Sequence, residues 1–231
     1  MAHLNHITFT GVDYKTDFIE LQKIQKRLPQ VEFGVLTSYH WHENGNRYLP
    51  PALFRYLGGF GLNLSLHLCG QAAIDAAAGE WNRIDILTFG CLDMFNRIQL
   101  NIVGKNINPA CVRKPKYEGQ EVIVQTSDLD GITPYETARS LSGKCFSFLL
   151  DKSGGRGIDT PVEAYRSSHK IGYAGGINSN NVGDKLRKLL ASPDAGEFWI
   201  DMESGVRTED WMDLEKVVMV VEQCESVLLE Q

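Results

Sequence analysis

Short runs of β-branched, aromatic and leucine residues recur along the chain, and most are bordered by Gly, Pro, Asn or Ser. Runs of this kind are typical of β-strands. The predicted strands are residues 6–10, 31–37, 62–68, 97–103, 121–127, 145–151, 170–176 and 197–202.

Longer segments with helical periodicity separate several of these strands. Within residues 13–27, for example, Phe18, Leu21 and Ile24 lie three positions apart, which places them on one face of a helix. Residues 181–191 and 208–228 carry apolar residues at the same spacing. We therefore predict amphipathic helices over these three segments.

The last predicted helix begins with a recognisable capping sequence. The hydroxyl of Thr208 would cap the first turn, and Glu209 and Asp210 would place carboxylates near the positive end of the helix dipole. A second feature is the long connection at residues 80–96, for which we expect an additional helix.

Alternation of strands and helices without a linker predicts a mostly parallel sheet, either open or closed. Eight strands within 231 residues favour closure, because closing the sheet removes both exposed edges. We therefore predict an α/β protein with a single (β/α)8 barrel over residues 1–231, enlarged near residues 80–96.

Composition narrows the possible partners. The chain is 43% hydrophobic and 23% charged, as in ordinary globular proteins, and its net charge is −6. No block of Lys and Arg is present to follow a phosphate backbone, so we expect no nucleic acid partner. No apolar stretch reaches the length of a membrane span, so we expect no membrane partner either.

The five cysteines are widely spaced and form no CxxC pair, which indicates reduced thiols rather than disulfides. The N-terminal residues lack the basic and apolar regions of a signal peptide. We expect a cytoplasmic protein, either a monomer or a homodimer.

In a barrel of this type the active site lies where the strands end. Thr10 ends the first predicted strand, Arg47 follows the second and Cys69 follows the third. Asp151 and Asp201 end the apolar runs FSFLLD and FWID, where partial desolvation would raise the pKa of a carboxyl toward a value useful for acid catalysis. The alternative for each aspartate is a structural role in capping a loop.

Three consecutive glycine-rich turns follow the sixth, seventh and eighth predicted strands. Glycine allows backbone N–H groups to approach an anion closely, and phosphate sites in such barrels lie near the last two strands. Each turn alone would be explained by a tight loop, but three at one end of the barrel favour a phosphate site. The predicted phosphate-binding residues are Gly154, Gly155, Gly175, Gly176, Ser204 and Gly205.

Two further pairs of residues carry side chains that are common in metal or catalytic sites. His40 and His42 alternate in a loop, but no third ligand stands at a recognisable spacing, so we predict no metal and no cofactor. His67 and Cys69 alternate with leucines and therefore share one side of a strand. They either face the mouth of the barrel or pack as ordinary core residues.

The segments LLDKSGGRGI (149–158), YAGGINSNNV (173–182) and WIDMESGVR (199–207) resemble phosphoribosylanthranilate isomerase, a TIM barrel enzyme of tryptophan biosynthesis. NRYLPP (46–51) and RIQLNIVG (97–104) resemble that family more weakly. The resemblance implies a phosphorylated small-molecule substrate and an Amadori rearrangement, in which a phosphoribosylamine opens and a proton leaves C2′.

The resemblance also implies roles for individual residues. Asp151 would be the general acid, Asp201 would hold the substrate amine or a ribose hydroxyl, and Arg47 would steer the anthranilate carboxylate or the catalytic loop. The backbone around Gly155, Gly176, Ser204 and Gly205 would bind the phosphate.

The chain departs from the family at the general base. The family has a cysteine before a glycine at the end of its first strand, whereas this chain has Thr10, whose hydroxyl is far too weakly acidic to serve as a comparable base. Asn101 likewise replaces a family histidine. Either Cys69, His67 or Asp13 takes over as base, or the substrate is a different phosphosugar, or the barrel binds a phosphorylated ligand without catalysis. A metal-dependent hydrolase using the histidines is a further alternative.

Overall fold

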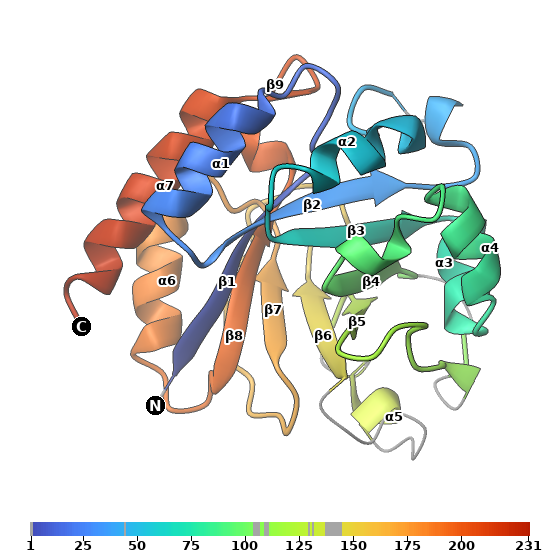
Figure 1. The fold of residues 1–231 in the computed structure, drawn as a ribbon. Helices are drawn as coiled ribbons and strands as arrows, with labels where there is room; N and C mark the ends of the chain where they lie inside the picture. Colours follow the sequence, from blue (N-terminus) through green and yellow to red (C-terminus); the bar gives the residue numbers. More distant parts are fainter. Residues whose placement is uncertain are drawn as a thin grey trace.

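The computed structural model describes residues 2–43, 45–103, 107–108, 111–128, 130, 132–136 and 145–231. Within them, eight parallel strands form a closed barrel in chain order, because each strand pairs with the next and the last pairs with the first (Figure 1). The strands are β1 (His3–Thr10), β2 (Val31–Thr37), β3 (Leu64–Cys69), β4 (Arg97–Asn101), β5 (Glu121–Thr126), β6 (Phe146–Asp151), β7 (Ile171–Ala174) and β8 (Glu197–Met202). The predicted (β/α)8 barrel is confirmed.

Helices surround the barrel unevenly. They are α1 (Phe18–Arg27), α2 (Phe54–Gly58), α3 (Gln71–Ala77), α4 (Trp81–Leu87), α5 (Thr133–Glu136), α6 (Val182–Leu190) and α7 (Leu214–Leu228). The segment between β6 and β7 contains no helix. No helix in the described part of the chain combines the length and apolar character that crossing a membrane requires.

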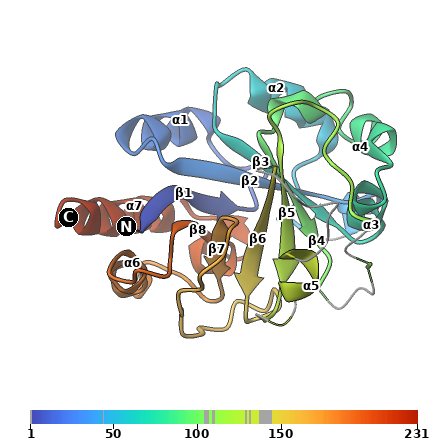
Figure 2. The ribbon, with the colours of Figure 1, turned by 90° about the horizontal axis from the view of Figure 1, so that it is seen from below.

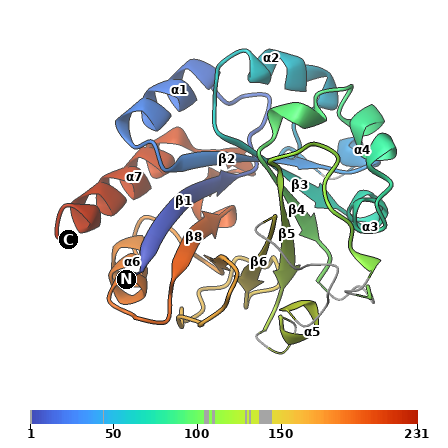
Figure 3. The same cartoon turned by 60° about the horizontal axis from the view of Figure 1, so that its bottom comes forward.

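Helices α1, α6 and α7 cover one flank of the barrel, and α2, α3 and α4 lie on the other (Figures 2 and 3). The guanidinium of Arg27 at the end of α1 donates hydrogen bonds to the Glu225 carboxylate on α7, the shortest at 2.6 Å. Both chain termini lie on this flank (Figure 1).

The start of α7 differs from the prediction. The predicted capping sequence does not begin a helix, because Arg207–Thr208 and Trp211–Met212 pair as the small antiparallel strands β9 and β10. Glu209 and Asp210 form the turn between them with positive φ values of 51° and 63°. The cap is instead Asp213, whose carboxylate accepts hydrogen bonds from the N–H groups of Glu215 and Lys216.

The enlarged connection at residues 80–96 contains α4 and a short 3₁₀ helix at Leu92–Met94. Helix α3 precedes it and was not predicted, because its alanine-rich sequence QAAIDAA lacks an obvious apolar stripe. Ala72, Ala73 and Ala76 are nevertheless completely buried, since small side chains let this helix pack closely.

The interior of the barrel is polar near the N-terminal ends of the strands. Arg97 on β4 donates a 2.9 Å hydrogen bond to Glu32 on β2, and both side chains are at most 3% exposed. Thr8 donates to the same carboxylate, and the Arg97 guanidinium lies 4.2 Å from the centre of a Trp199 ring. The apolar core instead fills the space between the strands and the outer helices, where residues such as Phe9, Phe33 and Val220 are buried.

Candidate functional site

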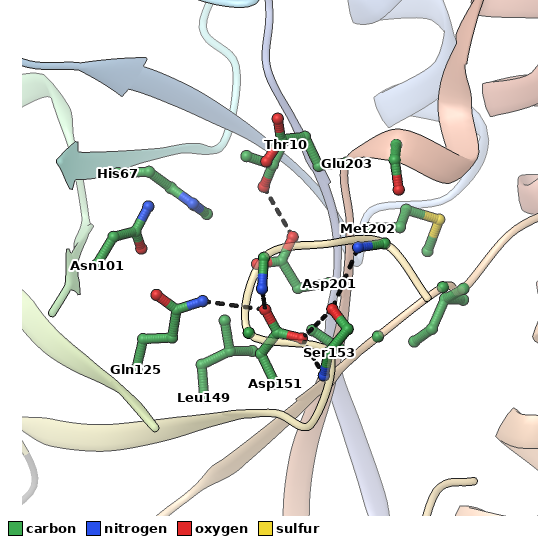
Figure 4. A pocket seen from close by; sticks show the side chains of 18 of the residues that line it. Thr10, His67, Asn101, Gln125, Leu149, Asp151, Ser153, Asp201, Met202 and Glu203 are labelled. Carbon is green, nitrogen blue, oxygen red and sulfur yellow. Dashed lines mark hydrogen bonds between the residues drawn. The ribbon is translucent and has the colours of Figure 1, made fainter. Parts of the chain in front are cut away.

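A cavity of about 280 Å³ opens at the C-terminal ends of the strands. Its lining comes from seven of the barrel strands and from the loops that follow β2, β4, β6, β7 and β8. Thr10, His67, Asp151 and Asp201 point toward the same space from β1, β3, β6 and β8 (Figure 4). The cavity therefore stands where a barrel of this kind places its chemistry.

Asp201 is one of two almost fully buried carboxyls of the cavity, with 5% of its surface exposed against 4% for Asp151. Burial raises the pKa of Asp201 to about 7, and the neighbouring carboxyls of Glu203, Glu32 and Asp151 act in the same direction. The hydroxyl of Thr10 opposes this by donating a 2.7 Å hydrogen bond to Asp201 Oδ1. A carboxyl with this pKa exchanges protons readily near neutral pH.

Asp151 is held by four donated hydrogen bonds. Its Oδ1 accepts from the N–H and the hydroxyl of Ser153 at 3.0 and 2.7 Å. Its Oδ2 accepts from the N–H of Gly155 at 2.6 Å and from Gln125 Nε2 at 3.1 Å (Figure 4). The side chain that ends β6 thus organises the glycine-rich loop that follows it.

Arg47 is flanked by two carboxylates. Its Nη1 lies 2.6 Å from Glu203 Oε1, and its Nη2 lies 2.7 Å from Asp210 Oδ1. Burial raises the pKa of Glu203, and the positive charge of Arg47 opposes that rise. Arg47 lines the cavity, but the charge of its guanidinium is already matched within the protein.

The three glycine-rich loops pack directly on one another. A Cβ at Gly157 would collide with the side chain of Ser204, one at Gly176 with the backbone of Asp159, and one at Gly205 with the carbonyl of Ile177. Glycine is therefore needed here for close loop packing. Five of the predicted phosphate-binding residues also line the cavity, and the one outside its lining is Gly205; the five are Gly154, Gly155, Gly175, Gly176 and Ser204.

The structure separates the three candidates for the missing base. His67 lines the cavity, but burial lowers its pKa to about 4. Cys69 is not among the lining residues, and burial raises the pKa of its thiol. Asp13 is completely buried and bonded to Arg207 and to the N–H of Met212, so it fastens the loop after β1 instead of facing the cavity.

The alternating histidines lie outside this cavity. His40 and His42 are exposed and approach the carboxylate of Glu43 at 3.5 and 3.4 Å. Within the described residues, no three His, Cys, Asp or Glu side chains come together in an arrangement suited to a metal ion.

From the sequence alone, no role was assigned to Glu203 and Gln125, two polar side chains of the cavity. Glu203 begins the glycine-rich turn after β8, and Gln125 shares the barrel interior with Ile123 through the two-residue repeat of β5. That repeat gave a usable signal for Gln125. For Glu203 no local signal existed, because its partner Arg47 is 156 residues away in the chain.

Comparison with known proteins supports the fold. No protein-family model matches the chain, and no curated protein matches it. Among solved structures, N-(5'-phosphoribosyl)anthranilate isomerase from Pyrococcus furiosus is similar over 97% of this chain and 100% of its own, with a TM-score of 0.56 and 18% identity. Phosphoribosyl anthranilate isomerase from Thermococcus kodakaraensis is similar over 96% of this chain and 99% of its own, with a TM-score of 0.54 and 20% identity. The chain thus shares the barrel fold of these isomerases.

Proposed function

We propose that the protein is an aldose–ketose isomerase that carries out an Amadori-type rearrangement of a phosphorylated ribosylamine. The observation that carries this proposal is the pair of carboxyls, Asp151 and Asp201, at the ends of β6 and β8 in one cavity beside three glycine-rich loops. The shared fold with two phosphoribosylanthranilate isomerases supports it as an analogy.

The phosphate would lie against the loops that follow β6, β7 and β8, where Gly155, Gly176 and Ser204 line the cavity. Backbone N–H groups in such loops are suited to an anion. The N–H of Gly155 is bonded to Asp151, so a phosphate that takes this donor would leave Asp151 Oδ2 with the longer hydrogen bond from Gln125. Phosphate binding and the availability of Asp151 for proton transfer are thereby coupled.

The rearrangement needs one proton delivered and one removed. Asp151 would protonate the ring oxygen, which breaks the C1′–O bond and leaves an iminium ion. Asp201 would then take the C2′ proton to give an enol, which tautomerises to the ketose. Asp201 fits the role of base because its pKa is about 7 and because Thr10, at the position of the family's cysteine, directs its hydroxyl at Asp201.

The test is turnover of freshly generated phosphoribosylanthranilate and of its counterpart with a carboxamide in place of the ring carboxylate, followed by loss of fluorescence and by detection of the ketose. We expect turnover of at least one compound by the wild type, and losses of about 10²-fold or more in Asp201→Asn and Asp151→Asn. Glu163→Gln, an exposed carboxyl of the β6–β7 connection, is the matched control. Ketose formation from neither compound would contradict the proposal.

A second function is favoured by one observation, the hydroxyl of Thr10 in place of a base. In this alternative the barrel binds a phosphorylated ligand and does not transform it. Binding of a stable product analogue at micromolar concentration, with no turnover of either compound, would support this alternative over the isomerase.

A further inference from the structure

The charges of the cavity limit which chemical group the substrate can carry at the end away from the proposed phosphate site. Among the described lining residues the ionisable side chains are Arg47, His67, Asp151, Asp201 and Glu203. Three of these are carboxyls, and the low pKa of His67 leaves its imidazole uncharged near neutral pH. Arg47 is therefore the one cation of this described lining, set against three acidic groups.

Arg47 is also already paired. Glu203 and Asp210 contact its two terminal nitrogens, and Arg47 Nε lies 3.2 Å from the same Asp210 oxygen. A substrate carboxylate at Arg47 would have to displace one of these carboxylates and would then lie beside it. Repulsion between two neighbouring carboxylates costs more free energy in a partly buried site than in water.

The wall formed by β3, β4 and β5 carries polar side chains without charge. Gln99, Asn101 and Gln125 carry neutral amides, and His67 carries a neutral imidazole. Two buried atoms of this wall, Gln99 Oε1 and His67 Nδ1, have no hydrogen-bond partner among the described residues. Neutral amides both donate and accept hydrogen bonds, so this wall suits an uncharged ligand group that does the same.

Resting on the proposed function, we propose that the substrate is a phosphorylated aminosugar whose other end is an uncharged hydrogen-bonding group, such as a carboxamide, and not a carboxylate. Glu203 is the residue that sets this specificity. Its carboxylate forms an ion pair with the Arg47 guanidinium, which would otherwise bind a substrate carboxylate. It also adds its own negative charge to the cavity.

The experiment measures, by calorimetry, the binding of two stable product analogues to the protein. Both are 1-deoxyribitol 5-phosphates with a phenylamino group at C1, and they differ only in a 2-carboxamide or a 2-carboxylate on the ring. We expect the wild type to bind the carboxamide about tenfold tighter or more. In Glu203→Gln we expect the preference to shrink or reverse, because Arg47 regains a free face for the carboxylate.

Equal or tighter binding of the carboxylate by the wild type would overturn the inference, whether or not Glu203→Gln folds. An unchanged preference in a folded Glu203→Gln would overturn the role of Glu203. Ribitol 5-phosphate, which lacks the ring, reports the phosphate site separately, and its failure to bind would overturn both proposals. Preference for the carboxamide without turnover would contradict the isomerase and leave standing the ligand preference that Glu203 sets.

Discussion

At the scale of one residue, the raised pKa of Asp201 makes the stability of the fold depend on pH. Its carboxyl is buried at the end of β8 with Thr10 as its hydrogen-bond donor, and its pKa is about 7. An unfolded aspartate titrates near 4, so the native state holds a proton that the unfolded state releases between these two values. Stability from this group is therefore present at low pH and is lost as pH rises toward 7.

Asp201→Asn should remove this loss. The amide is uncharged at every pH and its oxygen can still accept the Thr10 hydroxyl, so the variant should gain stability relative to wild type as pH rises from 4 to 8. Urea unfolding at a series of pH values measures the difference. Asp93→Asn, at an exposed aspartate, serves as the control. A difference that does not change with pH would contradict the assignment.

Thr10→Val tests the same hydrogen bond through the reaction. If Asp201 is the base, activity rises as Asp201 ionises near pH 7. The Thr10 hydroxyl lowers the pKa of Asp201, so Thr10→Val should move this rise to higher pH, whereas Thr10→Ser should leave it in place. The pH dependence of kcat/KM measures the shift, and coincident profiles for the Val and Ser variants would count against Asp201 as the base.

At the scale of elements, the β8–α7 connection illustrates how a local signal misleads. Thr208, Glu209 and Asp210 have the composition of a helix start, yet the chain first makes the β9–β10 hairpin and begins α7 at Asp213. The hairpin turn brings the Asp210 carboxylate to Arg47, a contact that a helix beginning at Thr208 would not make. A long-range contact thus prevails over the local capping preference.

Asp213→Ala should destabilise the protein by about 1 kcal/mol, because it leaves two N–H groups of the first turn of α7 without their acceptor. Asp213→Asn keeps an acceptor oxygen and should lose much less. Chemical unfolding of the two variants measures the contrast, and equal losses would mean that the side chain does not act as the cap.

At the scale of the whole molecule, the barrel interior is divided between a buried ion pair and the candidate site cavity. Glu32 and Arg97 lie on strands β2 and β4, which do not neighbour each other, so their bond crosses the interior of the closed sheet. Lys170 and Glu121 extend the network with a 3.0 Å contact. These charges depend on the whole barrel for their pairing.

Arg97→Met should cost about 3–5 kcal/mol, because it leaves the Glu32 carboxylate buried without its cation. The double variant Arg97→Met with Glu32→Gln should recover much of that loss. Lys23→Met, which breaks the exposed ion pair between Lys23 and Glu20, is the control and should change little. Equilibrium unfolding provides the measurement, and an additive double variant would show that the pair is not coupled.

Much of the fold was accessible from local pattern. The β2 and β8 boundaries were predicted to the residue, and the glycine-rich turns were placed at the end of the barrel where the cavity lies. Strand patterns and turn residues are local properties, so they can be read from a short window. The start of α7 and the existence of α3 could not be predicted from a short window, because tertiary packing decides them.

The sequence by itself determined which residues stand at the strand ends: Thr10, Asp151 and Asp201. Only the tertiary structure decided their environments. It left Asp13 and Cys69 outside the cavity lining and paired Arg47 with Glu203 and Asp210. Burial and charge pairing depend on distances between residues far apart in the chain, and those distances exist only once the barrel has closed.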